Sequence, residues 1–152
     1  MNKDQFKDFC KKEFETKGFK RIKKMYYLLG KDLLCGIELQ KSYYSESYYI
    51  NYYFFLGEFN DSKNYPIRYD MDVQGRITAM SRKQTIDGKQ FLTDMIEYEE
   101  YTEEELRPYF DKDFEEKILP PICYGKKYIL DNLRTLYFLT LHQEEVLQKL
   151  QS

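Results

Sequence analysis

The sequence is poor in the residues on which several kinds of chemistry depend. Its 152 residues include one histidine, three cysteines, seven glycines and no tryptophan. The glycines are not clustered as they are in a phosphate-binding loop. The single His142 has no neighbouring cysteine that would make a Cys–His nucleophile. The pattern therefore predicts no catalytic residue and no cofactor, and a binding protein is favoured over an enzyme.

The three cysteines predict neither a disulfide framework nor a zinc site. Cys10, Cys35 and Cys123 are odd in number, widely spaced and set among apolar neighbours. Zinc ligands follow shorter, characteristic spacings, and one histidine cannot complete a site with these thiols. We predict reduced, buried thiols, which are typical of a cytoplasmic protein.

Long apolar runs and a strong net charge are also missing. No run approaches the roughly 20 apolar residues that cross a bilayer, and residues 1–14 lack the apolar core of a signal peptide. The net charge of −2 disfavours a dedicated nucleic-acid-binding domain, because such domains are usually strongly basic. We expect a cytoplasmic protein that contacts neither membrane nor nucleic acid.

The charges that are present are unevenly distributed, and aromatic rings are abundant. Residues 1–24 carry nine basic and four acidic side chains, whereas residues 97–117 carry three basic and ten acidic ones. Such polarity steers a charged partner or simply belongs to a solvated surface. Six of the 16 tyrosines lie within residues 43–59. The composition is globular, and the length predicts a single domain, 1–152.

The spacing of apolar residues predicts a helix at the start of the chain. Its buried stripe follows the i, i+3, i+4, i+8 pattern of Phe6, Phe9, Cys10 and Phe14. Gly18 is placed to end this helix, because glycine readily adopts the left-handed closing conformation.

Four segments with strand character follow, and the tight turns between them imply an antiparallel meander. The strands are expected at residues 23–30, 33–42, 48–56 and 67–73, with Gln74-Gly75 as the closing turn of the last. Residues 76–101 are the least readable part of the chain. Within and just beyond them, residues 91–102 fit a fifth strand or a helix, and the strand is favoured.

The last third of the chain is predicted to be helical. Thr102 and Glu105 have capping-box spacing, and Pro108 then interrupts the pattern. The main helix is expected over 109–119, ended by Pro120-Pro121, with a further helix after Gly125 and a short one starting near Thr140. The fold class is therefore α+β: an N-terminal helix, an antiparallel meander of four or five strands, and C-terminal helices packed on the sheet.

Alternation along the strands sorts the side chains into two faces. One face is apolar, and the other mixes polar groups with rings, which supply orientation and contact area for a ligand or a partner. The candidate binding residues on this second face are Glu38, Gln40, Tyr49, Asn51, Tyr53, Arg68 and Asp70.

Other interpretations of the second face stay open. A C-terminal helix covers it, or it is exposed and carries cross-strand ion pairs such as Glu38 with Arg68, or it is buried in a homodimer. A chemical alternative is a small-molecule-binding or metal-assisted hydrolytic enzyme, in which Glu38, Asp70 and Asp72 hold a divalent ion. It depends on the two aspartates sharing one face of a strand.

One stretch resembles a known family. Residues 18–59 contain "GFKR", then "IELQKS" at Ile37–Ser42, then "YYINYYFFLGEF". This order resembles small, mostly bacterial proteins classed as domain of unknown function 4304. About 60 residues match well, "KILPPI" matches more loosely, and residues 76–101 hardly match. The resemblance implies a fold and no catalytic residue, and the gene neighbourhoods of some relatives suggest toxin immunity.

The leading functional hypothesis is a soluble, non-enzymatic binding module, such as an immunity-type inhibitor. Its partner would be a basic protein, bound through the aromatic–polar sheet face or through the acidic segment 97–117. The chain is expected to be a monomer or a weak homodimer.

Overall fold

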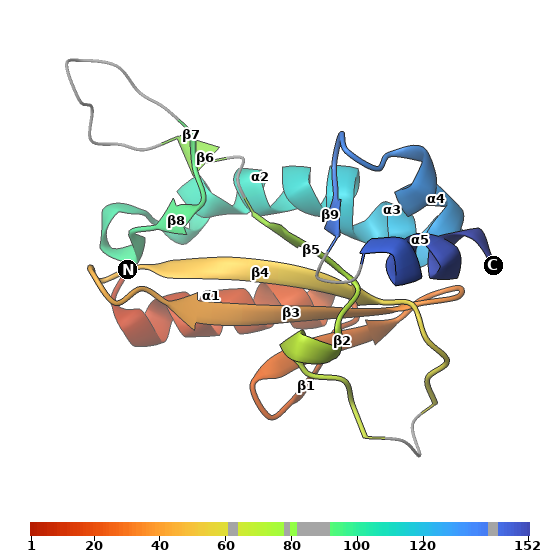
Figure 1. Cartoon of the computed structure of the whole chain (residues 1–152). Helices are drawn as coiled ribbons and strands as arrows, with labels where there is room; N and C mark the ends of the chain where they lie inside the picture. The colour runs from red at the N-terminus through yellow and green to blue at the C-terminus, as the bar shows by residue number, and fades with distance from the viewer. Residues whose placement is uncertain (61–63, 78–79, 82–91, 140–142) are drawn as a thin grey trace.

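A computed structural model describes residues 1–60, 64–77, 80–81, 92–139 and 143–152 (Figure 1). The helical elements are α1 (Lys3–Thr16), α2 (Glu103–Asp113), α3 (Leu119–Tyr124), α4 (Lys126–Asp131) and α5 (Gln143–Gln151), with 3₁₀ turns η1 (Arg68–Asp70) and η2 (Tyr98–Glu100) and a π-helical turn η3 (Phe114–Ile118). The strands are β1 (Lys20–Ile22), β2 (Met25–Leu29), β3 (Leu34–Lys41), β4 (Tyr48–Phe55), β5 (Val73–Arg76), β6 (Met80–Ser81), β7 (Leu92–Thr93), β8 (Met95–Ile96) and β9 (Phe138–Leu139).

The strands form one antiparallel sheet and a small separate ribbon. The sheet runs in the order β1-β2-β3-β4-β5-β9, and β8 pairs with β4 at Tyr48 and Tyr49, on the same edge as β5. The ribbon pairs β6 with β7. Together with the N-terminal helix and the C-terminal helices, this arrangement confirms the predicted α+β class (Figure 1).

Helix α1 forms as its sequence predicts. Asn2 and Gln5 cap its start reciprocally, with both hydrogen bonds at 2.8 Å. The predicted apolar stripe is buried along its whole length. Gly18 adopts φ +98°, and the Phe19 backbone N–H then donates to the Phe14 carbonyl at 3.0 Å. The ring of Phe19 thereby returns to the core beside Phe14.

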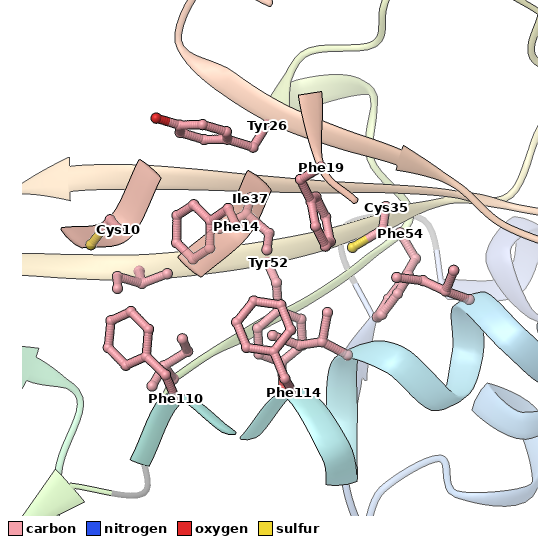
Figure 2. Packing of buried hydrophobic residues seen from close by; sticks show 14 of the residues in the cluster. Cys10, Phe14, Phe19, Tyr26, Cys35, Ile37, Tyr52, Phe54, Phe110 and Phe114 are labelled. Carbon is pink, nitrogen blue, oxygen red and sulfur yellow. The ribbon is translucent and has the colours of Figure 1, made fainter. Parts of the chain in front are cut away.

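The two central strands sort their faces as alternation predicts. In the β3–β4 register, Ile37 lies opposite Tyr52 on the core face, and Glu38 lies opposite Asn51 on the other. Tyr52 is 1% exposed, and its ring packs with those of the neighbouring strands and helices in the main core (Figure 2). Half of the aromatic side chains of β4 therefore lie in the main core.

The strand predicted over 67–73 is wrong. Residues 68–70 form the 3₁₀ turn η1, and Asp70 stabilises it by accepting a hydrogen bond from the Ile67 backbone N–H at 3.0 Å. The strand β5 begins later, and the expected turn at Gln74-Gly75 lies inside it. Gly75 is required there, because any Cβ at this position would overlap the Tyr52 ring.

The segment from 91 to 102 is strand in part. The short strands β7 and β8 occupy its first half, and η2 follows before Thr102 caps α2. The expected fifth strand is thus divided, and only β8 joins the main sheet.

The prolines do not interrupt the C-terminal helices where expected. Pro108 lies inside α2, whose buried Leu106 and Phe110 anchor it to the core. Pro120 and Pro121 lie in the first turn of α3, which follows η3 without a break, so they do not end the helical stretch. The helix after Gly125 ends at Asp131. Thr140 lies outside the described residues, and α5 covers 143–151.

The main core is an aromatic-rich layer between the sheet and the helices. Phe14 meets Tyr26 from the sheet at 5.1 Å and Phe114 from η3 at 6.0 Å between ring centroids (Figure 2). Cys10 and Cys35 are buried in this layer as free thiols, whereas Cys123 is exposed, which corrects the expectation of three buried cysteines. Among the described residues, no helix is both long and apolar enough to cross a membrane.

Candidate functional site

A groove lies beside strand β5, and we call it the β5 groove. Its volume is about 1170 Å³. Its walls come from β3, β4, β5, η1 and α5, and they include Gln40, Asn51, Tyr53, Arg68, Tyr69, Asp70, Gln74, Arg76, Asp94, Lys117, Glu145 and Lys149. The groove reaches around the β5 edge, because β9 pairs only with Val73 and Gln74.

A fixed network of polar side chains forms one part of the groove. Asn51 donates from Nδ2 to Gln40 Oε1 at 2.8 Å and accepts from Arg76 Nε at 2.8 Å. Arg76 also pairs with Asp94 at 3.3 Å, and its guanidinium lies over the Tyr49 ring, 4.2 Å from the centroid. These side chains therefore hold one another in place, and their orientation exists before any ligand arrives.

Five of the seven predicted binding residues line this groove. These five are Gln40, Asn51, Tyr53, Arg68 and Asp70. Tyr49 supports the groove from beneath Arg76. Arg68 and Asp70 reach it from the η1 turn and not from a strand, so their place beside the sheet has a different origin from the one predicted.

Glu38, also one of the seven predicted binding residues, does not line the groove. It lies between Met25 and Asn51 in the sheet, and its Oε2 is buried with no hydrogen-bond partner in the described ranges. Burial, and next the charge of Glu38, raise the pKa of Tyr27 to about 12. Arg68 makes no ion pair with Glu38, and its Nη2 donates to the Tyr69 hydroxyl at 3.0 Å.

The segment between β4 and β5, and not a C-terminal helix, covers the neighbouring part of this face. The Tyr27 hydroxyl donates to the Pro66 carbonyl at 2.8 Å, and the Tyr27 and Tyr65 ring centroids are 4.7 Å apart. A second, smaller apolar cluster results, which includes Met25, Tyr53 and Met71. The second face of the sheet is therefore partly roofed and partly open as the β5 groove.

The acids proposed for a metal do not gather. Asp70 caps η1. Asp72, 5% exposed, accepts from the Leu56 backbone N–H at 2.8 Å and from Lys149 Nζ at 2.9 Å. The two aspartates therefore do not share a strand face, and within the described ranges no three His, Cys, Asp or Glu residues form a group that would hold a metal ion.

The sequence reading missed Arg76 and Asp94. Both fall in the stretch that was unreadable, and Arg76 follows the residues assigned to a turn. With β5 placed at Val73–Arg76, alternation would put Arg76 on the same side of the sheet as Gln74. The missing information was the position of one strand.

Part of the charge asymmetry of the sequence is neutralised by ion pairs between the basic N-terminal region and the acidic segment. Lys17 of the basic N-terminal region pairs with Asp111 at 3.3 Å, and Arg107 of the acidic segment pairs with Glu13 at 3.0 Å. Other acids of the segment are exposed and make no ion pair with any described residue: Glu99, Glu100, Glu104, Glu115 and Glu116.

A comparison with family models identifies the family to which the chain belongs. Residues 10–121 match the model named domain of unknown function DUF4304. This chain is a member of the DUF4304 family. Comparisons with curated proteins and with solved structures found no match. The region shared with DUF4304 contains the Gln40–Asn51–Arg76–Asp94 network, whereas the α5 wall of the groove lies beyond it.

Proposed function

We propose that this DUF4304 protein is a non-catalytic binding module that holds an extended segment of a partner protein in the β5 groove. The prearranged network around Asn51 and Arg76 carries this proposal, because it fixes polar groups at an open, ring-bearing surface. The volume, about 1170 Å³, exceeds the roughly 300–1,000 Å³ that is usual for small-molecule pockets. A peptide segment therefore suits the groove better than a metabolite.

The charges of the groove favour a segment that contains a carboxylate. Four cations line the groove among the residues that the structure describes, and three of them already pair with acids: Arg76 with Asp94 at 3.3 Å, Lys117 with Asp113 at 3.4 Å and Lys149 with Asp72 at 2.9 Å. Arg68 forms no salt bridge with an acid in the described part of the chain, and its guanidinium contacts the Tyr69 hydroxyl and ring. Its guanidinium can therefore donate two parallel hydrogen bonds to a carboxylate, the geometry that arginine favours.

A displayed library of random peptides tests the proposal. Peptides selected on the intact protein should be enriched in Asp or Glu, and their Kd can be measured by fluorescence anisotropy. Arg68→Glu should weaken binding at least tenfold, because it replaces the attracting charge with a repelling one. Gln74→Trp, which fills the groove from an exposed position, should have a similar effect.

Lys127→Glu is the matched control. Lys127 is exposed on α4 and does not line the groove, so its reversal should leave the Kd within a factor of two. Circular dichroism and melting temperature must be unchanged in all three variants. Selected peptides that bind both groove variants as tightly as the wild type would overturn the proposal, as would a library that yields no binder.

A further inference from the structure

The hairpin between β3 and β4 ends in two tyrosines that the fold does not use. Tyr43 is 94% exposed and Tyr44 is 95% exposed, whereas Tyr48, five and four residues further on, is 4% exposed. Isolated exposed rings are ordinary on protein surfaces, but two adjacent and almost fully exposed rings form a patch.

The loop that carries these rings is held by hydrogen bonds. The Ser42 backbone N–H donates to the Ser47 carbonyl at 3.0 Å, and the Ser45 and Ser47 hydroxyls are 2.6 Å apart. The Tyr44 backbone N–H donates to Ser42 Oγ at 3.2 Å, and Lys41 Nζ donates to the Ser45 carbonyl at 3.0 Å. A partner that covers the two rings would therefore lose little conformational entropy in the loop.

The loop lies against the start of the acidic segment. The Tyr98 hydroxyl donates to Glu46 Oε2 at 2.6 Å, which fastens the hairpin tip to η2 (Figure 1). Glu99 and Glu100 of η2 and Glu104 of α2 are exposed and make no ion pair with described residues. Among nearby cations, Lys41 is already paired with Glu46 at 3.2 Å, and Lys3 and Lys7 of α1 approach Glu46 and the Tyr48 ring.

We propose that Tyr43 and Tyr44, with Glu46, Glu99, Glu100 and Glu104 beside them, form a docking surface for a lysine- and arginine-rich face of a partner protein. Tyrosine rings stack with guanidinium groups, and tyrosine is among the residues that dominate binding energy at interfaces. The surrounding carboxylates select a cationic partner and speed its approach. This surface shares no residue with the lining of the β5 groove and does not need a ligand there.

Octa-arginine peptide labelled with a fluorophore is the probe, measured by anisotropy at 0.15 M salt on the full chain. The double variant Tyr43→Ala/Tyr44→Ala should raise its Kd at least tenfold, as should Glu99→Lys/Glu100→Lys. Tyr124→Ala, which removes a ring that is 67% exposed elsewhere, should change the Kd by less than twofold. All these positions are exposed, so the fold should survive, as melting curves would show.

The pair Glu115→Lys/Glu116→Lys is the charge-matched control, because both glutamates are exposed in η3. Equal losses in the two acidic double variants would show general attraction to a negative chain and would overturn the proposal. Unchanged binding in the Tyr43→Ala/Tyr44→Ala variant, or no binding to the wild type, would do the same. Gln74→Trp should leave octa-arginine binding intact, so failure at this surface is distinguishable from failure at the groove.

Discussion

Replacing Gly75 by alanine should destabilise the protein by about 2 kcal/mol. A Cβ at this position would overlap Cζ and the hydroxyl oxygen of Tyr52. Tyr52 is 1% exposed and packs against Phe54 with ring centroids 6.1 Å apart, so its rigid ring cannot shift without disturbing that packing. Overpacking of this kind costs about 1–3 kcal/mol. Three overlaps with one rigid ring put this site at the upper end of that range, about 3 kcal/mol. The lower entropy of unfolded alanine returns about 0.4–1 kcal/mol, which leaves a net loss of about 2 kcal/mol.

Gly36→Ala is the internal control, because it also adds a methyl group to a glycine of the sheet. The new Cβ would lie 2.6 Å from Met25 Cε and 3.0 Å from Met71 Cε. Both atoms end flexible side chains that can shift aside. We therefore expect a change within about 0.5 kcal/mol, of either sign, since the entropic gain is the same as at Gly75.

Urea unfolding followed by far-ultraviolet circular dichroism measures both variants. With a slope of about 2 kcal/mol/M, Gly75→Ala should lower the midpoint by about 1 M and Gly36→Ala by less than about 0.3 M. The same alanine in a Tyr52→Leu background should cost less than about 0.5 kcal/mol, because the obstructing ring is gone. A wild-type midpoint for Gly75→Ala, or a cost that survives the loss of the Tyr52 ring, would refute the reasoning.

Two further predictions concern titration and thiol reactivity. Burial raises the pKa of Tyr27 to about 12, and the hydrogen bond to Glu46 raises the pKa of Tyr98 to about 12. Unfolded tyrosine ionises near pH 10, so the unfolded state loses its protons before the folded state does. The free energy of unfolding should therefore fall as the pH rises from about 10 to about 12. Urea titrations across this window measure it, and a rise would contradict the prediction. Burial raises the pKa of the Cys10 and Cys35 thiols, whereas Cys123 is exposed. Ellman's reagent should therefore label one thiol in the native protein and three in concentrated urea, and two fast native thiols would contradict the structure.

The elements predicted correctly are those in which local and tertiary preferences agree. Helix α1 has a cap, a stripe of buried rings and a glycine stop, all within 17 residues. In the β3–β4 hairpin, alternation decides both faces. Residues 67–73 also alternate, but the Asp70 side chain satisfies the Ile67 N–H and forms a turn, leaving Ile67 54% and Tyr69 79% exposed. Alternation alone does not separate these cases.

The candidate site was predictable to the extent that it lies on long strands. Gln40, Asn51 and Tyr53 follow from the alternation of β3 and β4. Arg76 and Asp94 come from short elements that only tertiary pairing defines, since β5 has four residues and Asp94 lies between two-residue strands. The groove itself also needs α5, which packs Val146 and Leu150 into the core and pairs Lys149 with Asp72, 77 residues apart in sequence.

The contacts between α1 and α2 have a consequence for how the chain folds during synthesis. Phe9 and Phe14 meet Phe110, and Lys17 meets a residue 94 positions later in the chain. At about 5–20 residues per second, a ribosome needs roughly 5–20 s to make that intervening stretch. Throughout this time the aromatic face of α1 can pack against the sheet but not yet against α2. The first helix to be synthesised is thus among the last to complete its packing. Until then the nascent chain depends on the partly formed sheet, or on a chaperone, to shield the aromatic rings of α1 from solvent.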